Sequence, residues 1–120
     1  METKPYVIAL DLDGTLLKDD KTISENTLQT IQRLKNDGHY VCISTGRPYR
    51  SSSMYYEQMN LTTPIVNFNG AFVHHPQDDS WGRYHTSLPL QVVKQLVNIS
   101  ETYNVHNILA EVIDDVYFQY

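Results

Sequence analysis

The feature that most constrains this sequence is an apolar run at residues 6–10 that leads directly into Asp11-Leu12-Asp13-Gly14-Thr15. The run contains β-branched residues and no charge, so it predicts a β-strand buried on both faces. The acidic segment then follows the carboxyl end of that strand, which is the edge where open α/β sheets bind their ligands. Because positions i and i+2 of an extended segment project to the same side, Asp11 and Asp13 are expected to share one face.

Two carboxylates so close together repel each other unless a cation lies between them or one keeps a proton. A hard divalent cation such as Mg²⁺ prefers oxygen ligands, so it would relieve the repulsion and bring phosphate oxygens beside the carboxylates. If one carboxylate attacks phosphorus while the other holds a proton for the departing oxygen, a difficult displacement becomes two easier steps. The alternative is an ordinary junction between a strand and a turn, where Asp and Gly are common.

The run Asp11-Leu12-Asp13-Gly14-Thr15-Leu16 after an apolar strand resembles the first motif of the haloacid dehalogenase superfamily of phosphohydrolases. The resemblance implies that Asp11 is the nucleophile, which forms an aspartyl-phosphate, and that Asp13 is the general acid and base. It also implies that Mg²⁺ is held by the Asp11 carboxylate and the Asp13 backbone carbonyl, so both residues count as metal ligands.

A second strand is expected at about residues 40–44, after a helix of about residues 25–36 that Ser24 can cap and Gly38 can end. A right-handed strand–helix–strand unit makes the ends of the two parallel strands neighbours. The second strand leads into a segment that contains hydroxyls and a glycine, and Pro48 is placed to open another helix. The sequence therefore predicts a second ligand-binding loop beside the acidic motif.

The run Ile43-Ser44-Thr45-Gly46-Arg47-Pro48 resembles the Cof-type branch of the superfamily, which carries a large α/β cap. The resemblance makes Thr45 the second-motif hydroxyl that binds the phosphoryl group, whereas by itself a threonine here is also an ordinary strand end. Backbone N–H groups around Gly46 suit an anion. Arg47 either contacts substrate or lies on the rim as a solvated charge, and the sequence leaves both open.

After a helix expected from Pro48 to about residue 59, a third strand at residues 65–68 is followed by Asn69-Gly70. The dipeptide is typical of a hairpin turn. The family resemblance adds that an Asn-Gly at this place commonly lies at the active site, with the asparagine on phosphate or substrate. Both interpretations stay open, with the site favoured.

The remaining residues predict a short hairpin at 71–75 and 81–85, then a helix at about 89–104 and strands at 107–113 and 116–120. His74, His75 and His85 could suggest a metal site, but His74 and His75 point to opposite faces of a strand and no cysteine joins them. These histidines are therefore expected to face solvent. The resemblance makes residues 86–120 the start of the cap and residues 1–85 the amino-terminal half of the core. Asp114-Asp115 is interpreted as a hairpin turn and not as the fourth motif of the family.

Composition narrows the function classes. The net charge is −5, from 9 Lys and Arg against 14 Asp and Glu, so no basic surface for nucleic acid is expected. No apolar run approaches the roughly 20 residues of a membrane span, and no signal pattern begins the chain, so no membrane partner and a cytoplasmic location are expected. Cys42 lies within an apolar strand and is interpreted as a small core residue.

The expected fold class is α/β: an incomplete Rossmann-like, parallel, three-layer core with the beginning of an α+β cap. The resemblance implies a Mg²⁺-dependent phosphatase of a small phosphorylated metabolite, such as a sugar phosphate or cofactor phosphate. The family's third-motif lysine and fourth-motif acids have no candidates in 120 residues, so a fragment of a longer enzyme is expected. Its partners would then be the missing carboxyl-terminal half, or another copy joined through open sheet edges.

Two other functions stay open. The first is an inactive remnant or binding module that keeps part of the fold. The second is a phosphoacceptor signalling domain, which is disfavoured because its acids would form an adjacent pair at the first strand and its acceptor would lie at a later one.

Overall fold

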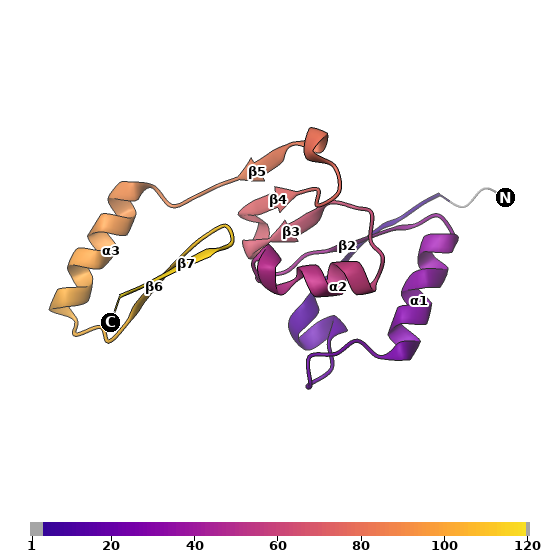
Figure 1. The fold of residues 1–120 in the computed structure, drawn as a ribbon, viewed down its shortest axis with the longest axis horizontal. Coiled ribbons are helices and arrows are strands. Elements are labelled where there is room, and N and C mark those ends of the chain that lie inside the picture. The colour runs from indigo at the N-terminus through magenta and orange to yellow at the C-terminus, as the bar shows by residue number, and fades with distance from the viewer. Residues whose placement is uncertain (1–3, 120) are drawn as a thin grey trace. The chain divides into compact units, whose positions relative to one another are not determined.

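The computed structural model describes residues 4–119, and the chain divides into two compact units, with the division after His85 (Figure 1). The first unit begins with β1 (Val7–Leu10), α1 (Glu25–Asn36) and β2 (Tyr40–Ile43). The strands β1 and β2 pair in parallel, with Ala9 opposite Cys42. The predicted α/β class with a parallel sheet is therefore confirmed.

The helix α1 has the ends that its sequence predicts. The Ser24 hydroxyl accepts a hydrogen bond from the Thr27 N–H at 3.2 Å, which satisfies one of the free donors of the first turn. Ile31 is buried in the core, and Leu28 and Leu34 pack partly against it. Gly38 follows with a φ of +88°, a left-handed conformation that glycine adopts without strain.

The third strand, β3 (Ile65–Asn67), joins the sheet through a parallel bridge between Ser44 and Val66. It then pairs with β4 (Phe72–His74), which pairs with β5 (Arg83–His85), and both pairings are antiparallel. The predicted hairpin is confirmed with shorter strands, and a 3₁₀ turn at Asp79–Trp81 lies between them. This order places the carboxyl ends of β1, β2 and β3 along one edge of the first unit.

The continuous helix expected from Pro48 to residue 59 is wrong. A 3₁₀ turn at Tyr49–Ser51 is followed by α2 (Ser53–Gln58), and Ser52 between them has φ −123° and ψ −16°. The Ser52 hydroxyl donates to the Pro48 carbonyl at 3.0 Å, and such a side-chain bond competes with the helical ladder.

The strand β1 is not buried on both faces as predicted. Its residues alternate between exposed and half-buried, and Val7 is 74% exposed, whereas Leu10 packs against the core. The alternation shows that only one face of β1 lies against the core within the described residues. That core gathers side chains from β2, β3, α1, α2 and their loops: Leu12, Leu17, Ile23, Ile31, Val41, Ile43, Tyr55, Tyr56, Met59, Leu61 and Ile65.

Two single residues also differ from expectation. Cys42 is half-buried instead of fully buried, and burial still raises the pKa of its thiol, which disfavours the reactive thiolate. His74 does not face solvent: its ring packs against Phe72, and its Nε2 lies 3.2 Å from the Asn67 Oδ1. His75 is half-buried and His85 is exposed.

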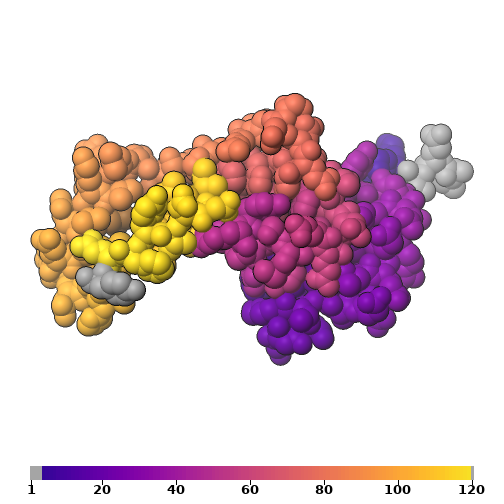
Figure 2. Space-filling view, viewed as in Figure 1, coloured from indigo at the N-terminus to yellow at the C-terminus, as the bar shows by residue number. Residues whose placement is uncertain are grey.

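The second unit contains α3 (Leu90–Thr102), β6 (Ile108–Val112) and β7 (Asp115–Gln119), drawn in orange to yellow in Figure 2. The two strands form an antiparallel hairpin in which Val112 faces Asp115. Asp114 therefore lies in the turn as predicted, while Asp115 already begins β7. No residue from Thr86 to Gln119 is buried. In the described part of the chain, no helix has the length and apolar character needed to cross a membrane.

Candidate active site

The loop after β1 is shaped by one buried side chain and one glycine. Leu12 is fully buried, whereas Asp11 and Asp13 on either side are exposed. Asp13 has φ −67° and ψ 126°, and Gly14 has φ 75° and ψ 1°, which are the angles of a type II turn. The second central residue of such a turn needs a positive φ, so glycine is the residue that fits without strain. The turn therefore presents both carboxylates outward from an anchored backbone.

The Asp11 carboxylate lies at the carboxyl end of β1 with one neighbouring hydroxyl. The Thr15 Oγ1 donates a hydrogen bond to Asp11 Oδ2 at 3.3 Å. The Asp11 backbone is extended, and its carbonyl accepts from the Leu16 N–H at 3.2 Å, which closes the loop beneath the side chain. This carboxylate is thus exposed, ionisable and open to an incoming electrophile.

The Asp13 carboxylate is held by two cations. Arg47 donates from Nε to Asp13 Oδ2 and from Nη2 to Asp13 Oδ1, both at 2.7 Å, in the bidentate geometry typical of a guanidinium and a carboxylate. The Lys21 ammonium donates to Asp13 Oδ1 at 3.0 Å. The hydrogen bonds from Arg47 and then Lys21 hold the pKa of Asp13 well below its usual range, and the pKa of Arg47 is raised in turn. In this arrangement Asp13 is an ionised acceptor.

Arg47 is fixed along its whole length. Its side chain is 22% exposed, its Nη1 donates to the Ser51 carbonyl at 2.9 Å, and its guanidinium lies 5.4 Å from the centre of the Tyr55 ring. Its backbone N–H donates to Thr45 Oγ1 at 3.1 Å. The structure thus brings Arg47 to the acidic motif and does not leave it as a solvated charge on the rim.

Thr45 is 3% exposed, and it connects the second and third strand ends. Its N–H donates to the Val66 carbonyl at 2.9 Å, and its own carbonyl accepts from the Asn69 N–H at 3.0 Å. The hydroxyl of Thr45 lies beside the Arg47 N–H, at the base of the 45–48 loop. The loop predicted from sequence is therefore a rigid neighbour of the β3–β4 turn.

Asn69-Gly70 forms the turn between β3 and β4 and also lies against the 45–48 loop. Phe68, Asn69 and Gly70 have successive φ values of 50°, 55° and 98°. A β-carbon added to Gly46 would lie 3.0 Å from Asn69 Oδ1, so the asparagine side chain covers Gly46. The hairpin-turn and the site interpretations of this dipeptide are thus compatible. Positive φ at a residue such as Phe68 is strained, and strain of this kind concentrates at functional sites.

Replacing Gly46 by Ala is expected to push the Asn69 side chain away and to lower substrate affinity about tenfold, because the added methyl occupies the contact. The measurement is KM for a phosphate ester, together with the side-chain amide signal of Asn69 by NMR. Ser44→Ala, two residues earlier, is the matched control. An unchanged amide signal and KM in Gly46→Ala would contradict the placement of Asn69.

Three contributors were missed by sequence reasoning. Lys21 lies in the charged connection after the acidic motif, where no motif marks it. Its backbone has a φ of 65°, and its carbonyl accepts from the Tyr55 hydroxyl at 2.7 Å. Asn67 and His74 were not singled out for the site. No local pattern marks these residues, because their partners are distant in sequence.

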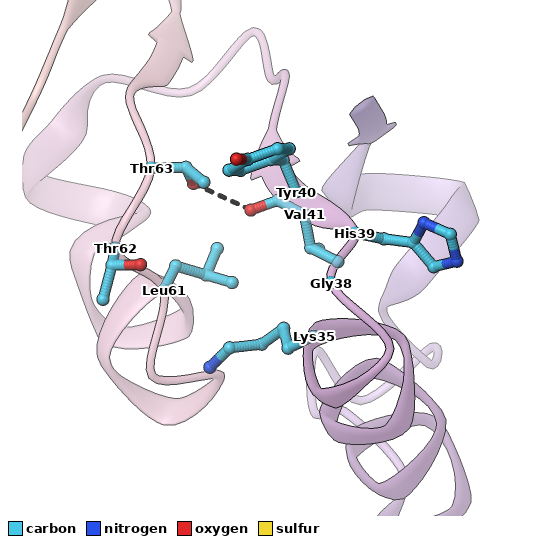
Figure 3. Close-up of a pocket in the computed structure, with 8 residues that line it drawn as sticks. All are labelled: Lys35, Gly38, His39, Tyr40, Val41, Leu61, Thr62 and Thr63. Carbon is cyan, nitrogen blue, oxygen red and sulfur yellow. Dashed lines mark hydrogen bonds between the residues drawn. The ribbon is translucent and has the colours of Figure 1, made fainter. Parts of the chain in front are cut away.

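A pocket of about 290 Å³ lies at the other edge of the sheet, where β2 begins (Figure 3). Lys35 reaches into it from the end of α1 and donates to the Met59 carbonyl at 3.0 Å, and the Thr63 hydroxyl donates to the Val41 carbonyl at 2.7 Å. These contacts tie α1 and β2 to the loop after α2. None of the residues that line this pocket belongs to the acidic motif, the 45–48 loop or Asn69-Gly70, so the pocket is separate from the candidate site.

The acidic motif offers oxygen ligands of the kind that Mg²⁺ prefers, namely the exposed Asp11 carboxylate and the Asp13 backbone carbonyl. The Asp13 carboxylate is engaged by Arg47 and Lys21 and is not free to coordinate. Among residues 4–119, no cluster of three or more His, Cys, Asp or Glu could hold a metal. Mg²⁺ commonly uses one or two protein carboxylates together with substrate phosphate and water, so the residues present fit part of such a site.

Known proteins resemble this chain over most of its length. A model of the haloacid dehalogenase-like hydrolase family matches residues 8–120. The chain is 92% identical over 120 residues to the Bacillus subtilis 5-amino-6-(5-phospho-D-ribitylamino)uracil phosphatase YitU, covering 100% of this chain and 44% of that protein. It is 30% identical over 110 residues to the Escherichia coli pyridoxal phosphate phosphatase YbhA, covering 86% of this chain and 38% of that protein.

The solved structure of a haloacid dehalogenase-like hydrolase from Bacteroides thetaiotaomicron has a TM-score of 0.80 at 26% identity, covering 96% of this chain and 44% of that one. The chain therefore spans less than half the length of these relatives. With its acidic motif at the carboxyl end of β1, its parallel sheet and a family match that extends from Ile8 onward, the chain belongs to the haloacid dehalogenase-like hydrolase family.

Proposed function

We propose that this chain contributes the nucleophile half of a Mg²⁺-dependent phosphatase of the Cof type, which hydrolyses a small phosphorylated metabolite through an aspartyl-phosphate. The observation that carries the proposal is the pair of exposed acids after β1, in which Asp11 is open and Asp13 is held by Arg47 and Lys21. The two cations that hold Asp13, two residues from the open Asp11 carboxylate, suit a phosphate dianion.

The substrate we propose is 5-amino-6-(5-phospho-D-ribitylamino)uracil, which the name of the Bacillus subtilis relative states for that protein. The support is the 92% identity, which extends over every residue of this chain. The chain covers 44% of the relative, so both this substrate and the contacts to its uracil and ribityl groups are proposed.

In the first chemical step, an Asp11 carboxylate oxygen attacks the phosphorus of the ester. A bond forms between Asp11 and phosphorus, the bond from phosphorus to the alcohol oxygen breaks, and Asp13 gives its proton to that oxygen. In the second step, water gives a proton to Asp13 and attacks the same phosphorus. The bond to Asp11 then breaks, which releases inorganic phosphate and restores the Asp11 carboxylate and the protonated Asp13 with which the first step began.

Asp13 must take up a proton for this role, whereas the contacts with Arg47 and Lys21 keep it ionised. We therefore propose that the phosphate dianion draws Arg47 away from Asp13 when substrate binds. Loss of the guanidinium raises the pKa of Asp13, because its ionised form loses its strongest hydrogen bonds. The same cation then neutralises charge on the phosphoryl oxygens.

Mg²⁺ would be held by the Asp11 carboxylate and the Asp13 backbone carbonyl, where its charge reduces repulsion between the nucleophile and the phosphate. The hydroxyl of Thr15 keeps the Asp11 carboxylate oriented through its hydrogen bond to Oδ2. Thr45, the N–H groups around Gly46 and the side chain of Asn69 would line the phosphate side.

The proposal is tested by measuring the uptake of beryllium fluoride, a phosphoryl mimic, in the presence of Mg²⁺, by the protein in the form in which its cell produces it. We expect one equivalent on wild type and none on Asp11→Asn, measured by fluorine NMR. Equal uptake by both proteins would contradict the nucleophile assignment. No uptake by wild type, with no turnover of phosphate esters, would instead favour a binding module.

A further inference from the structure

Behind the 45–48 loop lies a cluster of polar side chains that the proposed chemistry does not use. It consists of Asn67 at the end of β3, Ser52 before α2 and His74 at the end of β4. Asn67 and Ser52 are both fully buried at 0% exposure. A buried amide is expensive unless all its hydrogen bonds are made, so such a group has a specific role in holding its partners.

The contacts of Asn67 determine which way its amide points. One terminal atom of the side chain lies 2.9 Å from the Arg47 carbonyl and 3.0 Å from the Ser52 hydroxyl, and the other lies 3.2 Å from His74 Nε2. A backbone carbonyl only accepts, so the atom facing Arg47 is the nitrogen Nδ2. The oxygen Oδ1 therefore accepts, and the proton on the His74 ring is on Nε2.

The His74 ring is itself held between two aromatic rings. It stacks on Phe72 with ring centres 4.5 Å apart at 19°, and it meets the edge of Tyr49 at 5.0 Å and 89°. These contacts restrict the rotation of the imidazole. His74 consequently supports the Asn67 amide from the side opposite Arg47.

The carbonyl of Arg47 is thus held by two donors, the Asn67 side chain at 2.9 Å and the Phe68 N–H at 3.3 Å. The guanidinium of the same residue makes the bidentate contact with Asp13. A chain of hydrogen bonds therefore runs from β4 through Asn67 and Arg47 to the acidic motif. Displacement by about an ångström at a charged group of this kind is enough to lower rates about a hundred-fold.

We propose that Asn67, supported by His74, is a positioning residue that fixes the backbone of Arg47 and so aims its guanidinium at Asp13 and at the phosphate. The inference rests on the proposed phosphatase function of the same site. Asn67 contacts neither Asp11 nor Asp13 in the hydrogen bonds described here, so it acts through Arg47.

The experiment is a double-mutant cycle in the naturally expressed protein, with kcat and KM measured for a phosphate ester. We expect Asn67→Ala to lower kcat/KM about tenfold in the wild-type background and less than twofold in the Arg47→Ala background, because without the guanidinium Asn67 has no charge to position. His74→Leu leaves Asn67 in place and is expected to show a smaller loss with the same dependence on Arg47.

Thr63→Val is the matched control, because it also removes a side-chain hydrogen bond to a backbone carbonyl, that of Val41 at the opposite edge of the sheet. It is expected to leave kcat/KM unchanged at a similar loss of thermal stability. Equal losses from Asn67→Ala with and without Arg47 would overturn the proposal, since a purely structural residue acts independently of that side chain. Should Asn67→Ala fail to fold, the same comparison on His74→Leu decides.

A readout that needs no turnover separates this inference from the proposed function. The exchange of the Arg47 Nε–H with solvent, measured by NMR, is expected to be about tenfold faster in Asn67→Ala than in wild type. Faster exchange in a protein without phosphatase activity would support the positioning role while the proposed function fails. Unchanged exchange and unchanged kcat/KM in an active enzyme would overturn the positioning role alone.

Discussion

Asp11→Asn is expected to lower kcat for a phosphate ester at least about a thousand-fold, because the neutral carboxamide is a poor nucleophile and a weaker ligand for Mg²⁺. The substituted side chain has almost the same volume, so substrate should still bind between Arg47 and Lys21. The loss should therefore appear in kcat far more than in KM. Steady-state kinetics with saturating Mg²⁺ measure both.

Little of this loss should come from unfolding. Asp11 is exposed, and its side chain accepts only the 3.3 Å hydrogen bond from Thr15 in the contacts described here. Exposed substitutions of this type usually change stability by about 0.5 kcal/mol or less. Asp19→Asn, an exposed acid in the connection after the motif, is the matched control and should keep full activity. Retention of a tenth or more of wild-type kcat by Asp11→Asn would rule out the aspartyl-phosphate.

Arg47→Ala is expected to lower kcat/KM about a hundred-fold, because it removes a preorganised cation from the phosphate site. Arg47→Lys should recover only part of the loss. A lysine ammonium cannot make the two parallel hydrogen bonds that a guanidinium makes to phosphate oxygens, as Arg47 does to Asp13, nor the planar contact over Tyr55. Arg33→Ala on the exposed side of α1 is the control, and it should leave the kinetics unchanged. Equal activity of Arg47→Ala and Arg47→Lys would contradict a role for bidentate geometry.

The same substitution should change how the protein responds to acid. In wild type the folded-state pKa of Asp13 lies below its unfolded value, so the folded state binds fewer protons and the contribution to stability is present above the ordinary carboxyl pKa. That contribution is lost as the pH falls through the folded value. Arg47→Ala should raise the Asp13 pKa toward the ordinary range, with Lys21 still lowering it, as a carboxyl-carbon NMR titration measures. An unchanged titration would show that Arg47 does not hold Asp13 in solution.

Most of the first unit could be predicted, because its signals are local. The run before Asp11 specified a strand, Ser24 and Gly38 marked the ends of α1, and Asn69-Gly70 marked a turn. Each depends on neighbours within about four residues, which a linear pattern records. The helix expected after Pro48 failed because Ser52 bonds back to the Pro48 carbonyl, a local choice that the aromatic pattern around it concealed.

The contacts among side chains could not be predicted. Arg47 and Asp13 are 34 positions apart in the sequence. Nothing in either segment indicates that the guanidinium binds the Asp13 carboxylate together with Lys21. His74 was expected to face solvent. Strand alternation predicts on which face a residue lies, but it does not predict what packs against that face. Its burial depends on Asn67, Phe72 and Tyr49, which three different segments supply.

From sequence alone, this protein was determined to have a parallel α/β unit, an acidic motif at the end of its first strand and a family of phosphohydrolases to which the motif points. The positions of the strands and the caps of α1 follow from residues close in the chain, so they are readable without coordinates. Only the tertiary structure decided that Asp13 is held ionised by Arg47, and that Arg47 is held by Asn67. Such hydrogen bonds depend on distances of about 3 Å between distant segments, and these are set when the core packs.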